Sequence, residues 1–179
     1  MKIIVTGALG HIGSKLIRDL PNFFHDCEIV LIDNLKTQRY TSLFNLPSEG
    51  NYKFYDLDLI SYGMDRLDEI FQSTNYIIHL AALTDAASSF ENSMEVEKVN
   101  FESIKIVTDL SLKHNIKVIH VSSTSVYGTQ NDIVDENCER NELNPQSPYA
   151  ESKLKEEDHI QRFSKDMGLK ACIFRFGTI

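Results

Sequence analysis

Three glycines follow a short apolar run at the start of the chain, and they constrain its fold more than any other feature. The stretch reads MKIIVTGALGHIGSKLIRDL, with Gly7, Gly10 and Gly13 spaced three residues apart. Gly7 can adopt backbone angles that a side chain forbids, which suits a tight turn between a strand and a helix. The absence of a side chain at Gly13 would let that helix pack closely on the strand. The N-terminus therefore predicts a strand, a tight turn and a helix.

The same turn is suited to a phosphate group. A helix N-terminus offers free N–H groups and a partial positive charge, and the missing Cβ of Gly10 would let phosphates approach the backbone. The spacing is G-x-x-G-x-x-G, a variant of the dinucleotide-binding pattern G-x-G-x-x-G. Taken alone, the motif is equally consistent with a simple strand–helix turn.

Strand-like and helix-like stretches alternate along the whole chain. The expected strands, short and apolar on both faces, are Lys2–Thr6, Glu28–Ile32, Tyr52–Tyr55, Tyr76–Leu80, Lys117–Ser122 and Lys170–Arg175. The expected helices are Ile12–Leu20, Met64–Gln72, Met94–His114 and Ser147–Met167, with long loops at Leu35–Gly50 and Gly128–Pro148. Strands that are apolar on both faces occur where helices cover both sides of a parallel sheet. We therefore predict an α/β fold, a doubly wound parallel sheet (Rossmann fold) with helices on both faces.

Composition excludes several classes of partner. The 179 residues suit one domain, and their net charge of −8 leaves no basic stripe for nucleic acid. No apolar run approaches the ~20 residues that cross a membrane, and Ile3–Val5 is too short for a signal peptide. Cys27, Cys138 and Cys172 lie far apart without CxxC spacing, which indicates reduced thiols and no zinc site. We expect a cytoplasmic protein with no metal, no nucleic-acid partner and no membrane span.

An acidic residue follows the second expected strand. Asp33 lies ~20 residues beyond the glycines, where an acid bonds the adenosine ribose hydroxyls in dinucleotide-binding folds. Its carboxylate would repel a 2′-phosphate, and neither Asn34 nor Leu35 supplies a compensating positive charge. This pattern favours NAD over NADP, although a turn or helix-cap aspartate would look the same.

A hydroxyl cluster and a Tyr–Lys pair complete the chemistry-bearing residues. Ser123 lies at the end of the fifth expected strand, and Tyr149 and Lys153 are four residues apart, on one face if their stretch is helical. A nearby ammonium lowers a tyrosine pKa, so Tyr149 could take a proton from a substrate hydroxyl near neutral pH. Ser123 could hydrogen-bond the same substrate oxygen. Separately, these features are usually a packed tyrosine beside a solvated lysine and a polar turn.

In combination, the motifs resemble the extended short-chain dehydrogenase/reductase superfamily, and within it the NAD-dependent nucleotide-sugar epimerase/dehydratase family (UDP-glucose 4-epimerase-like). The segments Thr6–Gly13, Asp33, Asp56–Leu57, His79–Ala82, Ser123 and Tyr149–Lys153 occur in the same order, and the resemblance covers essentially all 179 residues. It implies NAD as the cofactor, a nucleotide sugar, most simply a UDP-sugar, as the substrate, and a homodimer.

The resemblance also implies a role for each matching residue. The implied cofactor-binding residues are Gly7, Gly10, His11, Ile12 and Gly13 at the pyrophosphate, Asp33 and Asn34 at the adenosine ribose, Asp56 and Leu57 at the adenine, Leu80, Ala81 and Ala82 along the cofactor, Asn100 in support of the active-site helix, and Tyr149 and Lys153 at the nicotinamide ribose. The implied catalytic residues are Ser123, Tyr149 and Lys153, and the implied substrate contacts are Thr84, Ser123 and Thr124. Asp56 could instead be a turn aspartate, Asn100 an ordinary buried amide, and Thr84 a helix cap.

The implied reaction is transient oxidation of a sugar hydroxyl, with epimerisation through a keto intermediate. In the family's 4,6-dehydratases, Asp-Glu follows the hydroxyl residue, whereas Thr124-Ser125 follow Ser123 here. This argues against 4,6-dehydration and leaves epimerisation or simple dehydrogenation or reduction. We expect a 4-epimerase; the alternatives are a nucleotide-sugar dehydrogenase or reductase, a 4,6-dehydratase, and a non-catalytic NAD-binding sensor module. Family members usually continue for well over a hundred residues more, so we expect residues 1–179 to be an NAD-binding domain that lacks the C-terminal substrate domain.

Overall fold

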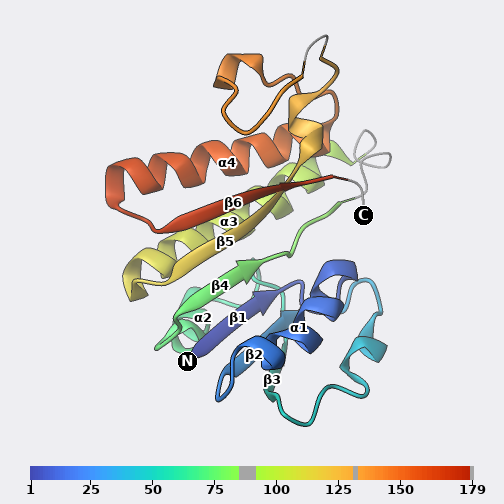
Figure 1. The fold of residues 1–179 in the computed structure, drawn as a ribbon. Helices are drawn as coiled ribbons and strands as arrows, with labels where there is room; N and C mark the ends of the chain where they lie inside the picture. The colour runs from blue at the N-terminus through green and yellow to red at the C-terminus, as the bar shows by residue number, and fades with distance from the viewer. Residues whose placement is uncertain (85–91, 131–132, 178–179) are drawn as a thin grey trace.

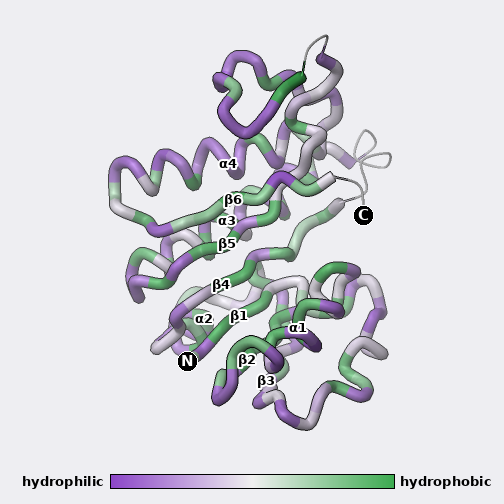
Figure 2. The backbone as a smooth tube through the Cα atoms, in the orientation of Figure 1, coloured by the Kyte–Doolittle hydropathy of each residue, from purple (hydrophilic) through white to green (hydrophobic). Residues whose placement is uncertain are grey.

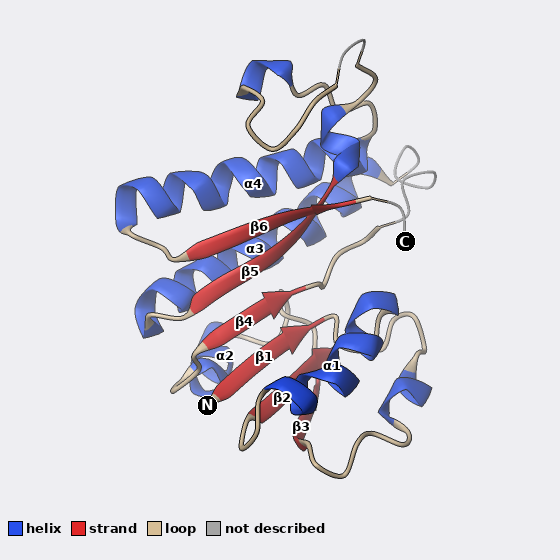
Figure 3. Cartoon of the chain, viewed as in Figure 1, coloured by secondary structure: helices blue, strands red, loops and turns tan. Residues whose placement is uncertain are grey.

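The described residues build one parallel sheet with helices on both of its faces. The computed structural model describes residues 1–84, 92–130 and 133–177. The strands are β1 (Lys2–Thr6), β2 (Glu28–Asp33), β3 (Asn51–Asp56), β4 (Tyr76–His79), β5 (Lys117–Ser123) and β6 (Ala171–Phe176). The helices are α1 (His11–Phe23), α2 (Met64–Phe71), α3 (Ser93–His114) and α4 (Pro148–Met167), with short 3₁₀ turns η1 (Tyr40–Leu43), η3 (Thr124–Tyr127) and η4 (Arg140–Glu142) (Figures 1 and 3).

The strand order is that of a doubly wound fold. Within the described residues the sheet has six strands in the order β3-β2-β1-β4-β5-β6, and every neighbouring pair is parallel. The chain moves outward from β1 to β3 and then returns to β4 on the other side of β1, where Thr6 pairs with both Ile32 and His79. Ligands of such sheets bind where the order reverses, beyond the carboxyl ends of the strands. The predicted Rossmann fold is confirmed.

Alternate residues of β1 face the two layers of the core. Ile3 and Val5 pack with Ile17 on the α1 side, while Ile4 packs in the cluster that contains residues of α2, α3 and α4. Successive side chains of a strand point to opposite faces, so a strand buried on both sides reads as a continuous apolar run. The hydrophobic residues accordingly follow the central strands (Figure 2).

The first helix runs further than its sequence suggests, because it continues past Pro21. Proline has no N–H to bond the carbonyl four residues earlier, which is that of Ile17. The Tyr52 hydroxyl, on β3, donates to this carbonyl at 2.8 Å. A tertiary contact therefore replaces the missing helical bond, and α1 ends at Phe23 instead of Leu20.

Two of the predicted long loops contain short helical turns and are held by side chains. Arg18 of α1 donates to the carbonyls of Ser42 and Phe44, at 2.9 Å each, and so fixes the segment around η1. Arg140 of η4 makes two bonds to the Asp158 carboxylate of α4, at 2.8 and 2.9 Å. These bonds fasten η1 to α1 and η4 to α4.

The remaining differences from the expected boundaries are small. β2 extends to Asp33 because this residue pairs with Asp56 of β3, whereas β4 ends at His79 and leaves Leu80 outside the strand. In the part of the chain that the structure describes, every helix is too short or too polar to cross a lipid bilayer. The homodimer stays a prediction.

Candidate active site

A cavity of about 690 Å³ opens at the carboxyl edge of the sheet, where the strand order reverses. Most of the predicted site residues line it: Gly7, Gly10, His11, Ile12, Gly13, Asp33, Asn34, Leu57, Leu80, Ala81, Ala82, Thr84, Ser123, Tyr149 and Lys153. Asp56, Asn100 and Thr124 are not on its wall. Segments spread over most of the chain therefore meet at one concave site.

The glycine turn is formed by close backbone packing. Gly7 has φ +64°, and a Cβ there would lie 2.7 Å from the backbone nitrogen of Ala81. A Cβ on Gly13 would lie 2.5 Å from the carbonyl oxygen of Gly7. Any side chain would force the turn away from β4 or α1 away from β1. The predicted turn and the predicted close packing of the helix are confirmed.

The N-terminus of α1 is open toward the cavity. Gly10 is its N-cap and supplies no side-chain capping bond, and the first turn of this described helix has no acidic residue. The backbone N–H groups of His11, Ile12 and Gly13 belong to the first turn, where no carbonyl of the helix can accept from them. The wall at this point is therefore suited to an anion.

Asp33 connects the glycine turn to the end of β2. Its carboxylate accepts from the Leu9 backbone N–H and from the Leu35 backbone N–H, both at 3.0 Å. Lys36 and Arg39 also line the cavity. Sequence reasoning considered only Asn34 and Leu35 as sources of positive charge and missed these two cations, which lie further along the loop.

The acid after β3 that reaches the cavity is Asp58. Asp56 is exposed at the end of β3, whereas Asp58 lines the wall and accepts from the Asn34 amide at 3.0 Å. Burial raises the pKa of Asp58, but the hydrogen bonds from Asn34 and Ile60 and the charge of Lys36 outweigh it and lower the pKa overall. Asp56 and Asp58 lie two residues apart in the sequence YDLDLI, so spacing alone does not show which of them lines the cavity.

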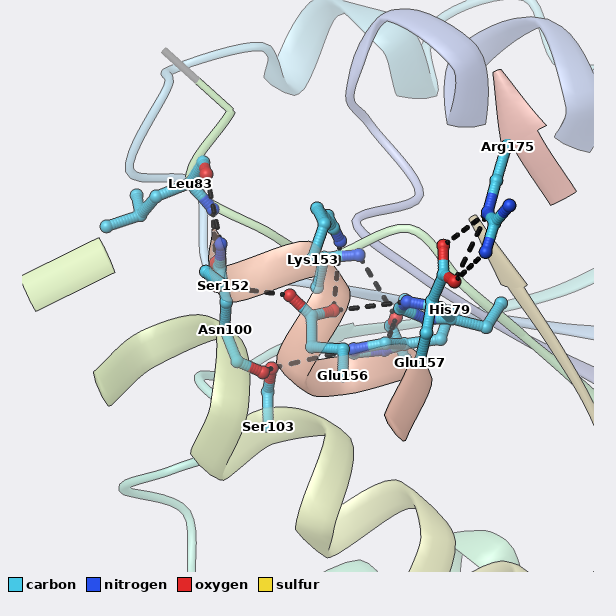
Figure 4. A network of polar contacts seen from close by, with 12 residues as sticks. His79, Leu83, Asn100, Ser103, Ser152, Lys153, Glu156, Glu157 and Arg175 are labelled. Atoms are coloured by element: carbon cyan, nitrogen blue, oxygen red, sulfur yellow. Dashed lines mark hydrogen bonds and ion pairs between the residues drawn. The ribbon is translucent and has the colours of Figure 1, made fainter. Parts of the chain in front are cut away.

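Asn100 holds the segment that follows β4 by two hydrogen bonds. Its side chain is fully buried in α3; it accepts from the Leu83 backbone N–H at 2.8 Å and donates to the Leu83 carbonyl at 3.2 Å. The resemblance assigns Asn100 to the support of the active-site helix, and the structure places it behind the cavity wall, where it bonds Leu83. It holds in place the backbone of residues 80–84, which forms that wall (Figure 4).

The start of α4 presents the Tyr–Lys pair. The Ser147 hydroxyl caps the helix by accepting from the Ala150 N–H at 3.1 Å, and Pro148 occupies the first helical position. Tyr149 and Lys153 follow one turn apart, and both line the cavity. The predicted helix and shared face are confirmed.

The hydroxyl cluster at the end of β5 faces the same pair. Ser123 accepts from the Ser125 N–H at 3.2 Å and from the Ser125 hydroxyl at 2.8 Å, so its own O–H proton is free for another acceptor. Ser125 lines the cavity, whereas Thr124 is exposed off its wall. Because a 3₁₀ turn begins at Thr124, the second hydroxyl to reach the cavity is that of Ser125.

Burial raises the pKa of Tyr149. The Lys153 charge and the Ser123 hydroxyl act in the opposite direction, while the Glu156 charge adds to the increase. The expected net lowering by Lys153 does not occur in the ligand-free protein. The main reason is burial of the phenol, and the Glu156 carboxylate, 3.0 Å from the Lys153 ammonium, adds to it.

Two buried ion pairs lie beneath this part of the site (Figure 4). Glu156 is fully buried, and its Oε2 lies 3.0 Å from Lys153 Nζ and 3.2 Å from His120 Nε2. Glu157, the next residue, binds Arg175 of β6 through three contacts of 2.7 to 3.2 Å. Neither carboxylate was singled out from the sequence, where both read as surface charges on a helix.

The sheet is doubly wound, and the glycine turn opens onto the point where the strand order reverses. The Tyr–Lys pair lines the same cavity. These features are typical of a dinucleotide-binding protein of the Rossmann class. The family model that matches residues 3–179 is described as the NAD dependent epimerase/dehydratase family. The chain belongs to this family, and the predicted membership, with its dependence on NAD, is confirmed.

Individual relatives support the assignment. A dTDP-D-glucose 4,6-dehydratase of Dictyostelium discoideum is 30% identical over 99% of this chain and 44% of that protein. A UDP-N-acetylglucosamine 4-epimerase from Methanobrevibacter ruminantium M1 is 30% identical, with a TM-score of 0.85 over 97% of this chain and 54% of that one. A UDP-glucuronic acid 4-epimerase from Bacillus cereus, in complex with NAD, is 26% identical, with a TM-score of 0.85 over 99% and 57%. The chain thus spans about half the length of these relatives.

Proposed function

We propose that this chain is the NAD-binding unit of a nucleotide-sugar 4-epimerase. The observation that carries the proposal is the convergence of Ser123, Tyr149 and Lys153 on the cavity that the glycine turn also lines. A non-catalytic NAD sensor has no need of this trio. The same trio lies where a sugar hydroxyl and a nicotinamide ring would have to meet.

The residues of the cavity fit NAD. The uncapped N-terminus of α1 would take the pyrophosphate, and the turn at Gly10 leaves room for close approach of phosphate oxygens. Asp33 would take the adenosine ribose hydroxyls, with Asn34 and Asp58 beside it. Bound there, NAD⁺ supplies a reversible acceptor for the hydride of the sugar carbon.

The protein's own residues would move the proton and orient the substrate. Tyr149 would remove the proton from the sugar hydroxyl, and the adjacent Lys153 ammonium would stabilise the resulting phenolate. Ser123 would donate its free O–H to the same sugar oxygen and fix its orientation. The proton would return from Tyr149 after the keto sugar has presented its other face.

Two features favour epimerisation over loss of water. A 4,6-dehydration needs an acid and a base near C5 and C6 of the sugar, and the residues after Ser123 are the hydroxyls Thr124 and Ser125. The solved structures similar to this chain also include several UDP-sugar 4-epimerases. We accordingly propose a UDP-sugar as the substrate, with 4,6-dehydration and simple oxidation as the competing outcomes.

The test is product analysis with the protein expressed from its complete coding sequence. UDP-, GDP- and dTDP-linked sugars are incubated with NAD⁺, and the stereochemistry at C4 is followed by NMR. The proposal predicts interconversion of C4 epimers of a UDP-sugar with no net formation of NADH. A 6-deoxy-4-keto product would indicate a dehydratase, and NADH accumulation a dehydrogenase; either result would overturn the epimerase assignment. A Tyr149→Phe protein should bind NAD⁺ but show no turnover.

A further inference from the structure

The carboxylate behind Lys153 has no part in the reaction proposed above, yet it is the most buried charge beside the site. Glu156 lies one turn beyond Lys153 in α4 and is fully buried. Its Oε1 accepts from the Ser152 hydroxyl at 3.3 Å, and its Oε2 lies between Lys153 and His120. A buried carboxylate costs several kcal/mol of desolvation unless it is well paired, so this position requires an electrostatic reason.

Two buried histidines, His79 and His120, lie close to this carboxylate. Burial lowers the pKa of His79 to about 3, so its ring is neutral at neutral pH. The Thr6 hydroxyl accepts from the Ala81 N–H at 3.3 Å and lies 2.7 Å from His79 Nδ1, to which it can donate its own proton. The Ser103 hydroxyl donates to the Asn100 carbonyl, which leaves its lone pair for His79 Nε2 at 3.5 Å. His79 is therefore the neutral Nε2–H tautomer.

Burial keeps His120 neutral. Its ring is fully buried and stacks on that of His79, with 5.8 Å between the centroids, and burial lowers its pKa. Desolvation raises the pKa of Glu156, but the charge of Lys153 and the contact with His120 outweigh it and bring the pKa to about 2. At neutral pH the cluster therefore contains one cation and one anion, those of Lys153 and Glu156.

We propose that Glu156 is a positioning residue that holds the Lys153 ammonium against the cavity wall and restrains the ionisation of Tyr149. The proposal rests on the proposed function, in which Tyr149 is the base. The ionisable groups around Tyr149 and Glu156 are Lys153 and Glu157 on α4, His120 on β5 and His79 on β4; the neighbouring hydroxyls are those of Ser103, Ser123 and Ser152. Among these groups, Glu156 is the anion in direct contact with Lys153.

The sign of the effect follows from the charges. With Glu156 ionised, the Lys153–Glu156 pair is neutral overall, so it attracts a phenolate less than a free ammonium would. Removing the Glu156 charge leaves a net positive charge beside Tyr149. The first apparent pKa of the coupled Tyr149–Lys153 pair should then be lower. Bound NAD⁺, whose nicotinamide ring carries a positive charge, would act in the same direction.

The test compares Glu156→Gln with Glu157→Gln in the 179-residue chain. Glu156→Gln keeps an acceptor for Lys153 but removes the charge, while Glu157→Gln removes the charge of the adjacent buried ion pair, that with Arg175. Tyrosine ¹³Cζ shifts are followed by NMR against pH, with Tyr149 assigned by its absence in Tyr149→Phe. Glu156→Gln should ionise Tyr149 about one pH unit lower than the wild type. Glu157→Gln should leave the Tyr149 titration unchanged although it disturbs folding to a similar extent.

Two further measurements keep the proposal open to refutation. Glu156→Asp retains the charge, so Tyr149 should titrate in it as in the wild type. If Glu156 acted only through the length of its side chain, this variant would behave like Glu156→Gln. In the wild type, ¹⁵N NMR should show His120 neutral at neutral pH; a protonated His120 would neutralise Glu156 and overturn the proposal, even if Glu156→Gln fails to fold.

The outcomes separate this proposal from the proposed function. If Tyr149 ionises no earlier in Glu156→Gln than in the wild type, the restraint by Glu156 is refuted, whatever the complete protein catalyses. If the titration shifts as expected but the wild type turns over no nucleotide sugar, the electrostatic pairing stands and the role of Tyr149 as a base fails. If both hold, the acid limb of the pH–rate profile should move about one unit lower in Glu156→Gln.

Discussion

The Asp33 carboxylate accepts a hydrogen bond from the Leu9 backbone N–H, with 3.0 Å between Oδ2 and the nitrogen. This bond joins the end of β2 to the glycine turn that follows β1. The other oxygen accepts from the Leu35 N–H, at the same distance. Asp33 therefore shapes the turn as well as placing a negative charge on the cavity wall, and a test of its charge must preserve its shape.

Asp33→Asn comes nearest to this condition, because it keeps the side-chain size and one of the two backbone hydrogen bonds, and it should alter cofactor preference. The amide retains one acceptor for the turn but removes the charge that repels a 2′-phosphate. We expect NAD⁺ affinity to fall about tenfold and NADP⁺ affinity to fall less, or to rise with the help of Lys36 and Arg39, which line the same wall. Isothermal titration calorimetry with both cofactors measures the ratio, and Asp65→Asn, on the exposed first turn of α2, is the control. An equal loss for both cofactors would refute the role of Asp33.

His11→Asp should change stability and cofactor binding in opposite directions. An acid in the first turn of a helix stabilises it by about 0.3–1 kcal/mol, so the melting temperature should rise or stay constant. The same charge would repel a pyrophosphate at the N-terminus of α1 and should weaken NAD⁺ binding at least tenfold. Ser14→Asp adds the same charge one turn later, off the cavity wall, and should leave binding much closer to that of the wild type. Equal affinities of the two variants would place the phosphates elsewhere.

Asn100→Ala should destabilise the protein. The substitution leaves the backbone N–H and carbonyl of Leu83 without their partner, at a cost of about 2–3 kcal/mol. Urea unfolding followed by circular dichroism measures the loss. NAD⁺ affinity should also fall, because the Leu80–Thr84 backbone lines the cavity. A fully stable variant would show that the segment after β4 is held by other contacts.

On acidification, the free energy of unfolding should start to decrease at a pH well above the range in which carboxyl groups titrate. Burial lowers the pKa of His79 to about 3 and also lowers the pKa values of His120 and His159. Below pH ~6.5 the unfolded chain binds protons at these histidines that the folded rings do not bind, so the free energy of unfolding falls as the pH falls. The fully buried His79 ring contributes a slope of up to about 1.4 kcal/mol per pH unit, and the other two act in the same direction. His79→Gln should flatten this slope by about that amount between pH ~6.5 and the pH at which unfolding is complete. An unchanged slope would mean that His79 titrates normally.

The sequence predicts those features that local backbone chemistry determines. The glycine turn follows from the need for positive φ at Gly7 and close packing at Gly13, and the position of β1 follows from its apolar run. The Tyr149–Lys153 face follows from helical spacing after a Ser-Pro start. All of these depend on residues close in sequence.

Features that depend on distant contacts could not be predicted. The choice of Asp58 over Asp56 depends on where the chain leaves β3, and the partner of Asn100 lies seventeen residues back in the sequence. The burial of Glu156 requires His120 of β5, brought beside α4 by the sheet. In the sequence KLKEEDHI, Glu156 and Glu157 look like solvent-facing charges.

The most direct test of the account is an isotope-edited nuclear Overhauser measurement on the chain with NAD⁺ bound. The nicotinamide C4 proton is irradiated and the ring protons of Tyr149 are observed, with Tyr149→Phe to assign them. We expect a contact between the nicotinamide C4 proton and the Tyr149 ring, because the glycine turn and the start of α4 line one cavity. Bound NAD⁺ whose nicotinamide contacts other residues but not Tyr149 would contradict it.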